Sequence, residues 1–212
     1  IVTGYLKDMI KFDDVTYFEN PKFSTTNMVE TLFCAKDKLE DSVIVSYGDI
    51  IFQKDVLQKL INSKDDISVV IDKKWKKYWE IRTTQPLNDV ESLVLENGFI
   101  QNIGQKVSSL DEIEGQYIGL MKFQNEGLEF LKTFYQTAKN ESFMGNILNP
   151  DIPFEKSYMT DLLQGLINSS CKLKAVLIEN GWLELDNYHD YEVYNKKFKD
   201  KTIFEFFSLN QL

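Results

Sequence analysis

The chain has 212 residues, with 33 acidic against 24 basic side chains and a net charge of −9 at pH 7. This acidity argues against sequence-independent binding of nucleic acid or of anionic membranes, which needs clustered lysine and arginine. No stretch approaches the roughly 18 apolar residues of a membrane-spanning helix. Hydrophobic residues make up 43% of the chain, which is enough for a folded core. We therefore expect a globular protein with no nucleic-acid or membrane partner.

The first half of the chain alternates helical and strand patterns. Apolar residues at helical spacing predict a helix over 26–39, capped by one of the hydroxyl residues at 24–26. Residues 42–46 and 67–71 are β-branched runs typical of buried parallel strands. The amphipathic segment 54–63 between them predicts a helix. This order predicts a βαβ unit with a right-handed crossover.

The rest of the chain adds a hairpin and further alternating elements. Strand patterns at 92–95 and 99–103 flank Asn97 and Gly98, a dipeptide that favours a two-residue hairpin turn. The remaining predicted elements are a strand at 116–122, helices at 127–139 and 158–169, and strands at 173–178 and 181–186. Together these patterns predict an α/β fold with a Rossmann-like, three-layer, mixed and mostly parallel sheet and a small antiparallel insertion.

Cysteine and histidine usage limits the chemistry. Cys34 and Cys171 lie far apart among apolar neighbours, which predicts two free thiols in a reducing cytoplasm. The lone His189 excludes a centre built from several histidines and argues against a Ser-His-Asp triad. Because no repeat, linker or low-complexity tract interrupts the chain, we interpret residues 1–212 as a single domain.

Acidic residues follow two of the predicted strands, at the positions where open α/β sheets bind their ligands. Asp49 follows one strand across Gly48, and Asp186 ends another, with Glu184 on the same side of that strand. Converging carboxylates suit Mg²⁺, which commonly shares its ligands with nucleotide phosphates, so this pattern favours phosphoryl or nucleotidyl transfer. The alternative is structural, because aspartate after glycine is common in turns and caps, and a Glu-Leu-Asp strand can be solvated.

A second cluster combines aromatic and acidic side chains in a segment interpreted as a loop. It contains Trp75, Tyr78, Trp79, Arg82 (the only arginine of the chain), Asp89 and Glu91. Aromatic rings with carboxylates can hold a substituted ammonium group, and a lone guanidinium can clamp a phosphate or carboxylate. The rings could instead anchor a loop onto the core. Lys106, after a predicted strand, could face a phosphate, although lysines in turns are commonly only solvated.

Several short stretches resemble a known family, and they occur in that family's order. They are residues 2–5, 26–28, 46–49, 89–91, 103–106, 115–119, 158–161 and 181–186. The chain resembles the nucleotidyltransferases that make nucleotide-activated sugars and alcohols, especially the cytidylyltransferases acting on phosphocholine, 2-aminoethylphosphonate or phosphoglutamine. The resemblance implies the nucleotide-diphospho-sugar transferase fold, with CTP and a small phosphorylated acceptor as partners. It also implies Mg²⁺ as the cofactor, and it is compatible with a homodimer.

The resemblance further implies roles for single residues. Mg²⁺ would be held by Asp49, Glu184 and Asp186. Asn27 and Gly48 would lie near the nucleotide, and Lys106 would face the acceptor phosphate, completing a catalytic set with Asp49 and Asp186. The acceptor pocket would be formed by Tyr117, Gly119, Trp182, Trp75, Trp79, Arg82, Asp89 and Glu91.

The expected reaction joins CMP from CTP to a phosphorylated or phosphonate small amine or alcohol and releases pyrophosphate. One alternative is a hexose-1-phosphate nucleotidyltransferase that uses UTP or dTTP. Another is a non-catalytic nucleotide-binding remnant, because the family's glycine-rich phosphate loop, which follows its first strand, does not occur in this sequence. Since residues 2–5 resemble the family's second strand, we expect the missing strand and loop to precede Ile1.

Overall fold

The computed structural model describes residues 1–208, and the chain divides into two compact units. Within the described residues, the first unit contains residues 1–42 and 125–171, and the second contains residues 43–124 and 172–208. Each unit is therefore assembled from two separate stretches of the chain. The interpretation of residues 1–212 as a single domain stays a prediction.

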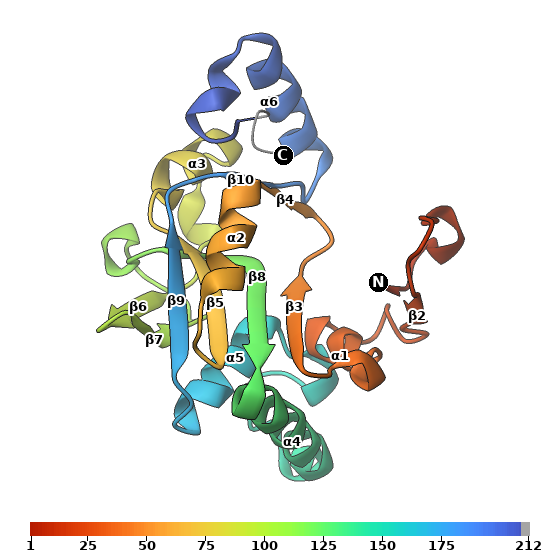
Figure 1. Ribbon diagram of the computed structural model, residues 1–212. Coiled ribbons are helices and arrows are strands. Elements are labelled where there is room, and N and C mark those ends of the chain that lie inside the picture. Colours follow the sequence, from red (N-terminus) through yellow and green to blue (C-terminus); the bar gives the residue numbers. More distant parts are fainter. Residues whose placement is uncertain (209–212) are drawn as a thin grey trace. The chain divides into compact units, whose positions relative to one another are not determined.

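A six-stranded mixed sheet, in the order β3–β8–β5–β9–β7–β6, forms the centre of the second unit (Figure 1). Its strands are β3 (Ser42–Ser46), β5 (Ile67–Asp72), β6 (Leu93–Glu96), β7 (Phe99–Ile103), β8 (Gln116–Gln124) and β9 (Leu173–Ile178). β5 is parallel to β9 and antiparallel to β8, whereas β7 is antiparallel to both β6 and β9. Every residue of β5 is buried, as its β-branched run predicts.

The predicted helix between the first two strands is present, but β3 and β5 are not neighbours, because β8 lies between them. Helix α2 (Lys54–Asn62) contacts β5, β8 and β9, and its Val56 and Leu60 side chains are buried. Before it, β4 (Ile50–Phe52) pairs antiparallel with β10 (Trp182–Glu184) in a separate two-stranded sheet. This pairing places the residues around β4 beside a much later part of the chain.

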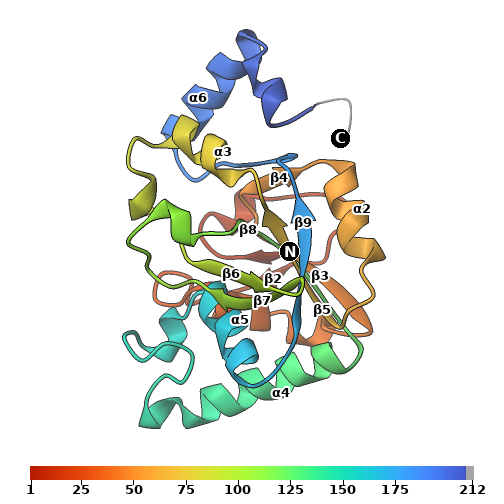
Figure 2. The same ribbon diagram turned by 90° about the vertical axis from the view of Figure 1, so that its left-hand side faces the viewer.

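The predicted hairpin is confirmed (Figure 2). β6 and β7 pair antiparallel, and the two residues between them are Asn97 and Gly98. Asn97 has a φ of 52° and Gly98 a φ of 80°. Two consecutive residues with positive φ match the turn that best fits the twist of paired strands, and asparagine and glycine adopt such angles most readily.

Helix α3 (Trp75–Arg82) corrects the interpretation of residues 75–91 as a loop. Its buried residues are Trp75, Tyr78, Trp79 and Arg82, whose spacing places them on one helix face. Helix α6 (Tyr188–Lys199) contacts α3 in the same unit. It begins with a capping box, in which the Asp190 N–H donates to the Asn187 side chain and the Asn187 N–H to the Asp190 carboxylate.

The first unit is mainly helical. It contains α1 (Met28–Phe33), α4 (Asn125–Glu141), α5 (Met159–Asn168) and a parallel pair of strands, β1 (Val2–Thr3) and β2 (Phe18–Glu19). Helix α1 is shorter than the predicted 26–39 helix. Its cap is Asn27 rather than a hydroxyl residue at 24–26, because the Asn27 side chain accepts the Met28 N–H at 2.9 Å. The Phe33 ring of α1 stacks on Tyr135 of α4, with ring centroids 3.4 Å apart.

Short 3₁₀ helices complete both units. They are Lys7–Met9, Lys36–Lys38, Ser142–Met144 and Phe154–Lys156 in the first unit, and Pro86–Asn88, Leu110–Glu112 and Thr202–Glu205 in the second. None of the helices within residues 1–208 is long and apolar enough to cross a bilayer.

Candidate functional site

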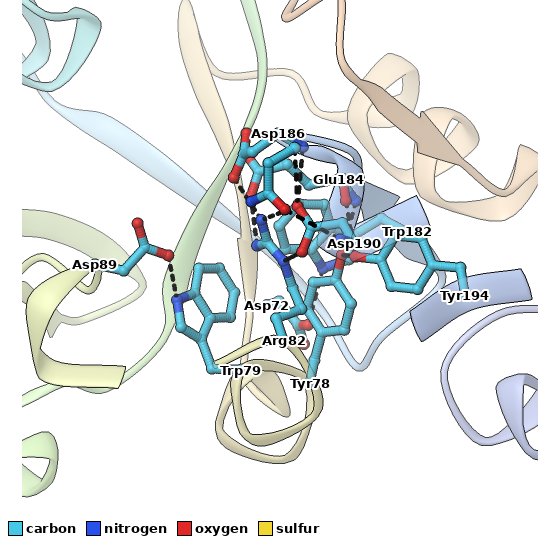
Figure 3. Close-up of polar contacts among 11 residues, drawn as sticks. Asp72, Tyr78, Trp79, Arg82, Asp89, Trp182, Glu184, Asp186, Asp190 and Tyr194 are labelled. Carbon is cyan, nitrogen blue, oxygen red and sulfur yellow. Dashed lines mark hydrogen bonds and ion pairs between the residues drawn. The ribbon is translucent and has the colours of Figure 1, made fainter. Parts of the chain in front are cut away.

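Arg82 of α3 lies at the centre of a carboxylate cluster in the second unit (Figure 3). Its guanidinium pairs with Glu184 at 2.7 Å, with Asp186 at 2.5 Å and with Asp190 at 3.2 Å. The Arg82 side chain is only 5% exposed and that of Asp190 only 2%. Because a guanidinium presents its donors in a planar fork, one arginine can serve all three carboxylates. The cluster therefore joins α3, the end of β10 and the first turn of α6.

Two aromatic rings complete the surroundings of this guanidinium. The Arg82 Cζ atom lies 5.5 Å from the centroid of the Tyr78 ring and 5.3 Å from that of the Trp79 ring. Both rings belong to α3 and lie one helical turn before Arg82. We call the five residues around the Arg82 guanidinium the carboxylate box: Tyr78, Trp79, Glu184, Asp186 and Asp190.

The electrostatics of the box show an excess of negative charge. The pKa of Glu184 is raised to about 7. Burial is the main cause, the charges of Asp186 and Asp49 add to the rise, and Arg82 opposes it. Burial also raises the pKa of Asp186, against the influence of Arg82 and with further repulsion from Asp49 and Asp190. Burial disfavours the charged form of Arg82, but the hydrogen bond to Asp190 and the neighbouring Tyr78, Glu184 and Tyr194 oppose burial, and the pKa of Arg82 is raised. Arg82 thus stays positive among carboxylates that outnumber it.

Two tyrosine hydroxyls hold the backbone of Glu184. The Glu184 N–H donates to the Tyr78 hydroxyl at 2.7 Å, and the Tyr194 hydroxyl donates to the Glu184 carbonyl at 2.7 Å. The two hydroxyl oxygens are 2.6 Å apart. Because the single proton of the Tyr194 hydroxyl goes to the carbonyl, the proton between the tyrosines must come from Tyr78. The three hydrogen bonds therefore form a closed ring that fixes the position of Glu184.

A buried aspartate supports the other end of β10. The Asp72 carboxylate accepts the Trp182 Nε1–H at 2.9 Å and the backbone N–H groups of Lys74 at 2.8 Å and Asn180 at 3.0 Å. Burial raises the pKa of Asp72, and these three hydrogen bonds oppose the rise. Asp72 ends β5, so it connects the central strand of the sheet to the strand that carries Glu184.

Asp49 lies just before β4, beside the end of β10. Its carbonyl accepts the Leu185 N–H at 2.8 Å. Its charge helps to raise the pKa of both Glu184 and Asp186. The structure therefore brings the three predicted metal ligands into one region, although within residues 1–208 no three histidine, cysteine, aspartate or glutamate side chains form a group that could hold a metal ion.

The donor set nevertheless suits a Mg²⁺ ion that shares its ligands with phosphate. Mg²⁺ is usually held by one or two carboxylates together with waters and substrate phosphates. Asp49 is exposed and the Asp186 side chain is 40% exposed, and the Arg82 ion pair uses only one oxygen of Asp186. Glu184 is more buried and is turned to Arg82. Asp49 and Asp186 are therefore the residues that fit such an ion best.

Tyr117 and Gly119, predicted to border the acceptor pocket, lie beside Tyr47. The Tyr47 and Tyr117 rings meet edge to face with centroids 5.7 Å apart, and the Tyr47 N–H donates to the Gly119 carbonyl at 2.9 Å. Gly119 has a φ of +81°, and a Cβ there would lie 2.6 Å from the Tyr47 side chain. The close approach of these two segments therefore requires glycine.

The remaining predicted site residues are less closely connected to the box. Trp75 is buried against Trp79, whose Nε1–H donates to the exposed Asp89 at 3.0 Å, so these rings anchor α3 in the core. Gly48 and Lys106 are exposed, and Glu91 is half-buried. Asn27 belongs to the first unit, so its role at the nucleotide stays a prediction.

Sequence reasoning missed three residues of this region: Asp72, Asp190 and Tyr194. A signal existed for Asp190, which follows Asn187 at capping-box spacing. Asp72 and Tyr194 sit at ordinary positions of a strand end and a helix. Only their contacts with Trp182 and Glu184, far away in the sequence, show what they do.

Comparison with known proteins places the chain in a family. No family model matches it. The CTP:phosphoglutamine cytidylyltransferase of Campylobacter jejuni is 41% identical to it over 208 residues, which is 93% of this chain and 80% of that protein. The chain belongs to the cytidylyltransferase family. This membership confirms the resemblance inferred from the short stretches, including its cytidylyltransferase branch.

Solved structures show the same fold for this cytidylyltransferase chain. The inositol-1-phosphate CTP transferase of T. maritima matches with a TM-score of 0.60 at 17% identity, over 85% of this chain and 65% of its own. A putative glucose-1-phosphate thymidylyltransferase of Bacillus anthracis matches with a TM-score of 0.57 at 15% identity, over 87% of this chain and 65% of its own. The CTP:phosphocholine cytidylyltransferase of Streptococcus pneumoniae matches with a TM-score of 0.58 at 15% identity, over 87% of this chain and 69% of its own. These likenesses confirm the predicted Rossmann-like, three-layer α/β fold, and the chain spans about two thirds of each solved chain.

Proposed function

We propose that this protein transfers CMP from CTP to a small phosphorylated acceptor and releases pyrophosphate. The observation that carries the proposal is the 41% identity to a CTP:phosphoglutamine cytidylyltransferase over 93% of the chain. Phosphoglutamine, which that relative's name gives as its substrate, is accordingly the favoured acceptor. The carboxylates at the end of β10 support the proposal, because Mg²⁺ is usually held by one or two carboxylates together with substrate phosphates.

In this reaction a phosphate oxygen of the acceptor attacks the α-phosphorus of CTP. The new P–O bond forms while the bond to pyrophosphate breaks, and the leaving group departs with the electron pair. Such a transfer depends on positioning and on neutralising the developing charge rather than on a general base. Mg²⁺, held by Asp49 and Asp186, would supply charge neutralisation at the phosphates.

The protein's own residues position these groups. Arg82 orients the Asp186 carboxylate through a 2.5 Å ion pair. The closed ring of hydrogen bonds among Tyr78, Tyr194 and the Glu184 backbone fixes the position of Glu184, two residues before Asp186. Lys106, which is exposed, would face the acceptor phosphate. The cytoplasmic location and the homodimer stay predictions.

The test is pyrophosphate release by the protein with a panel of nucleotides and acceptors. We expect release with CTP and phosphoglutamine, and little release with UTP or dTTP and a hexose 1-phosphate. Release with the sugar phosphate instead would support the hexose-1-phosphate alternative. Nucleotide binding without release for any pair would support the non-catalytic alternative.

An Asp49→Asn variant tests the role of the exposed carboxylate. We expect Mg²⁺-dependent release to fall by a factor of about 100 or more, because one lost electrostatic contact to a transition state commonly costs that much. Asp151→Asn, an exposed aspartate of the first unit, is the matched control and should keep wild-type activity. Unchanged Mg²⁺-dependent activity of Asp49→Asn would remove Asp49 from the site.

A further inference from the structure

We propose that Gln53 and the segment Glu205–Ser208 form a clamp that fixes the register of β4 against β10. The clamp thereby sets the position of Asp49 relative to Asp186, the two carboxylates that we place at the metal. Gln53 is thus a positioning residue, at the opposite end of the strand pair from these carboxylates. The inference rests on the proposed function, and its main test does not depend on turnover.

The strand pair that positions the two carboxylates needs support from outside. β4 and β10 form a two-stranded sheet of their own, separate from the six-stranded sheet (Figure 1). Each of the two strands has only 3 residues. An isolated pair of strands is at best marginally stable in water. Other parts of the second unit must therefore hold this pair in register.

The register of the pair determines where the two carboxylates meet. Glu184 pairs with Ile50. The pairing continues at the next residue, where the Asp49 carbonyl accepts the Leu185 N–H at 2.8 Å, so Asp186 directly follows the residue opposite Asp49. A shift of one residue would turn one carboxylate to the other face, and a shift of two would move it by roughly 7 Å. Mg²⁺ tolerates neither change, because it requires nearly ideal octahedral geometry.

The clamp holds the opposite end of the pair. There the Gln53 N–H donates to the Gly181 carbonyl at 2.8 Å. The Gln53 side-chain amide donates to the Ser208 carbonyl at 2.8 Å. The Gly181 N–H donates to the Phe206 carbonyl, also at 2.8 Å. The residue after β4 and the residue before β10 are therefore both bound to the same short segment.

The contacts of the clamp are buried and closely packed. Gln53 is 7% exposed, and Phe206 and Phe207 are 6% and 1% exposed. Gly181 has a φ of +88°, and a Cβ there would lie 2.8 Å from the Gln53 Oε1 atom. This close approach requires glycine. Because a buried polar group that loses its partner is costly, the bond from Gln53 to Ser208 keeps the segment in place.

The experiment uses the reciprocity between metal binding and opening of the clamp. If opening destroys the metal site, a bound metal must suppress opening by the same factor. We follow amide hydrogen exchange of Gln53, Gly181 and Leu185 by NMR in magnesium chloride, with sodium chloride at equal ionic strength as the blank. Mg²⁺ at about ten times its dissociation constant should slow exchange of all three amides about tenfold. In Asp49→Asn the same Mg²⁺ concentration should have no such effect.

Gln53→Met tests the clamp directly, because it removes the amide donor and keeps the length of the side chain. Loss of this hydrogen bond should speed exchange of the Gly181 and Leu185 amides about 3- to 10-fold without metal. Gln58→Met, which changes an exposed glutamine of α2, is the matched control and should exchange like wild type. If Gln53→Met does not fold, the comparison of wild type with Asp49→Asn decides the proposal.

Three results would overturn the clamp. Mg²⁺ that slows exchange at Leu185 but not at Gln53 and Gly181 would show that the two ends of the pair open independently. Equal slowing in Asp49→Asn, or wild-type exchange at Leu185 in folded Gln53→Met, would also exclude it. Pyrophosphate release decides the proposed function separately. Release without this coupling would overturn only the clamp, and coupling without release would overturn only the proposed function.

Discussion

Replacement of Tyr194 by phenylalanine tests the ring of hydrogen bonds around Glu184. The change removes the 2.7 Å bond to the Glu184 carbonyl and leaves the Tyr78 hydroxyl without the acceptor that lies 2.6 Å away. A hydrogen bond contributes a net 0.5–1.5 kcal/mol, so we expect two lost bonds to lower the free energy of unfolding by about 2 kcal/mol. Tyr78→Phe also breaks two bonds of the ring and should have a similar effect.

The double variant gives a sharper test, because the two tyrosines share one bond. Together the changes break three hydrogen bonds rather than four, so the free energy of unfolding of the double variant should fall by about 3 kcal/mol. The double-mutant cycle should therefore show a coupling energy of about 1 kcal/mol between the two tyrosines. Urea unfolding followed by circular dichroism measures these free energies, provided that the variants share the wild-type dependence of the free energy of unfolding on urea concentration. Tyr188 is 72% exposed, so Tyr188→Phe is the control and should lie within about 0.5 kcal/mol of wild type. Strict additivity of the two single changes would refute the closed ring.

Two further predictions concern stability. Gly119→Ala should lower the free energy of unfolding by about 1–2 kcal/mol from the left-handed backbone alone, with more from the 2.6 Å approach to Tyr47. Gly48→Ala, whose Cβ would meet open space, is its control, and equal effects in urea unfolding would contradict the packing described for Tyr47. Because burial raises the pKa of Asp72, the stability linked to this group is fully present below its unfolded pKa and is lost as the pH rises through its folded pKa. As the pH rises through the folded pKa of Asp72, the free energy of unfolding of wild type should therefore fall relative to that of Asp72→Asn. Urea midpoints across a pH series measure this difference. A rise in the relative stability of wild type would show that the hydrogen bonds to Asp72 outweigh its burial.

Local patterns predicted the central elements well. β3, α2, β5 and β9 follow their predicted ranges to within a residue, because continuous β-branched runs and a clear apolar face leave few alternatives. Helix α3 was missed although its buried residues are spaced as on a helix face. The aromatic residues favoured an interpretation as a ligand-binding loop, and an arginine is not expected at a buried position of a helix.

The site could be predicted only in part, for a similar reason. The neighbourhood of Asp49, Glu184 and Asp186 followed from the rule that ligands bind at strand ends. The partners of Arg82 did not follow, because they lie 102 to 108 residues further along the chain. No local pattern encodes such a contact. A buried guanidinium that serves three carboxylates is specified by the tertiary fold alone.

The interrupted path of the second unit also has a consequence for how the protein is made. Arg82 meets Asp190 across 108 residues, and Asp72 meets Trp182 across 110. At a synthesis rate of 5–20 residues per second, about 5–20 s separate the emergence of α3 from that of its partners. During that time its tryptophans and its arginine have none of these contacts, and closing so long a loop is slow. The carboxylate box is therefore among the last parts to assemble on a nascent chain, and a chain that stops before β10 exposes the aromatic face of α3.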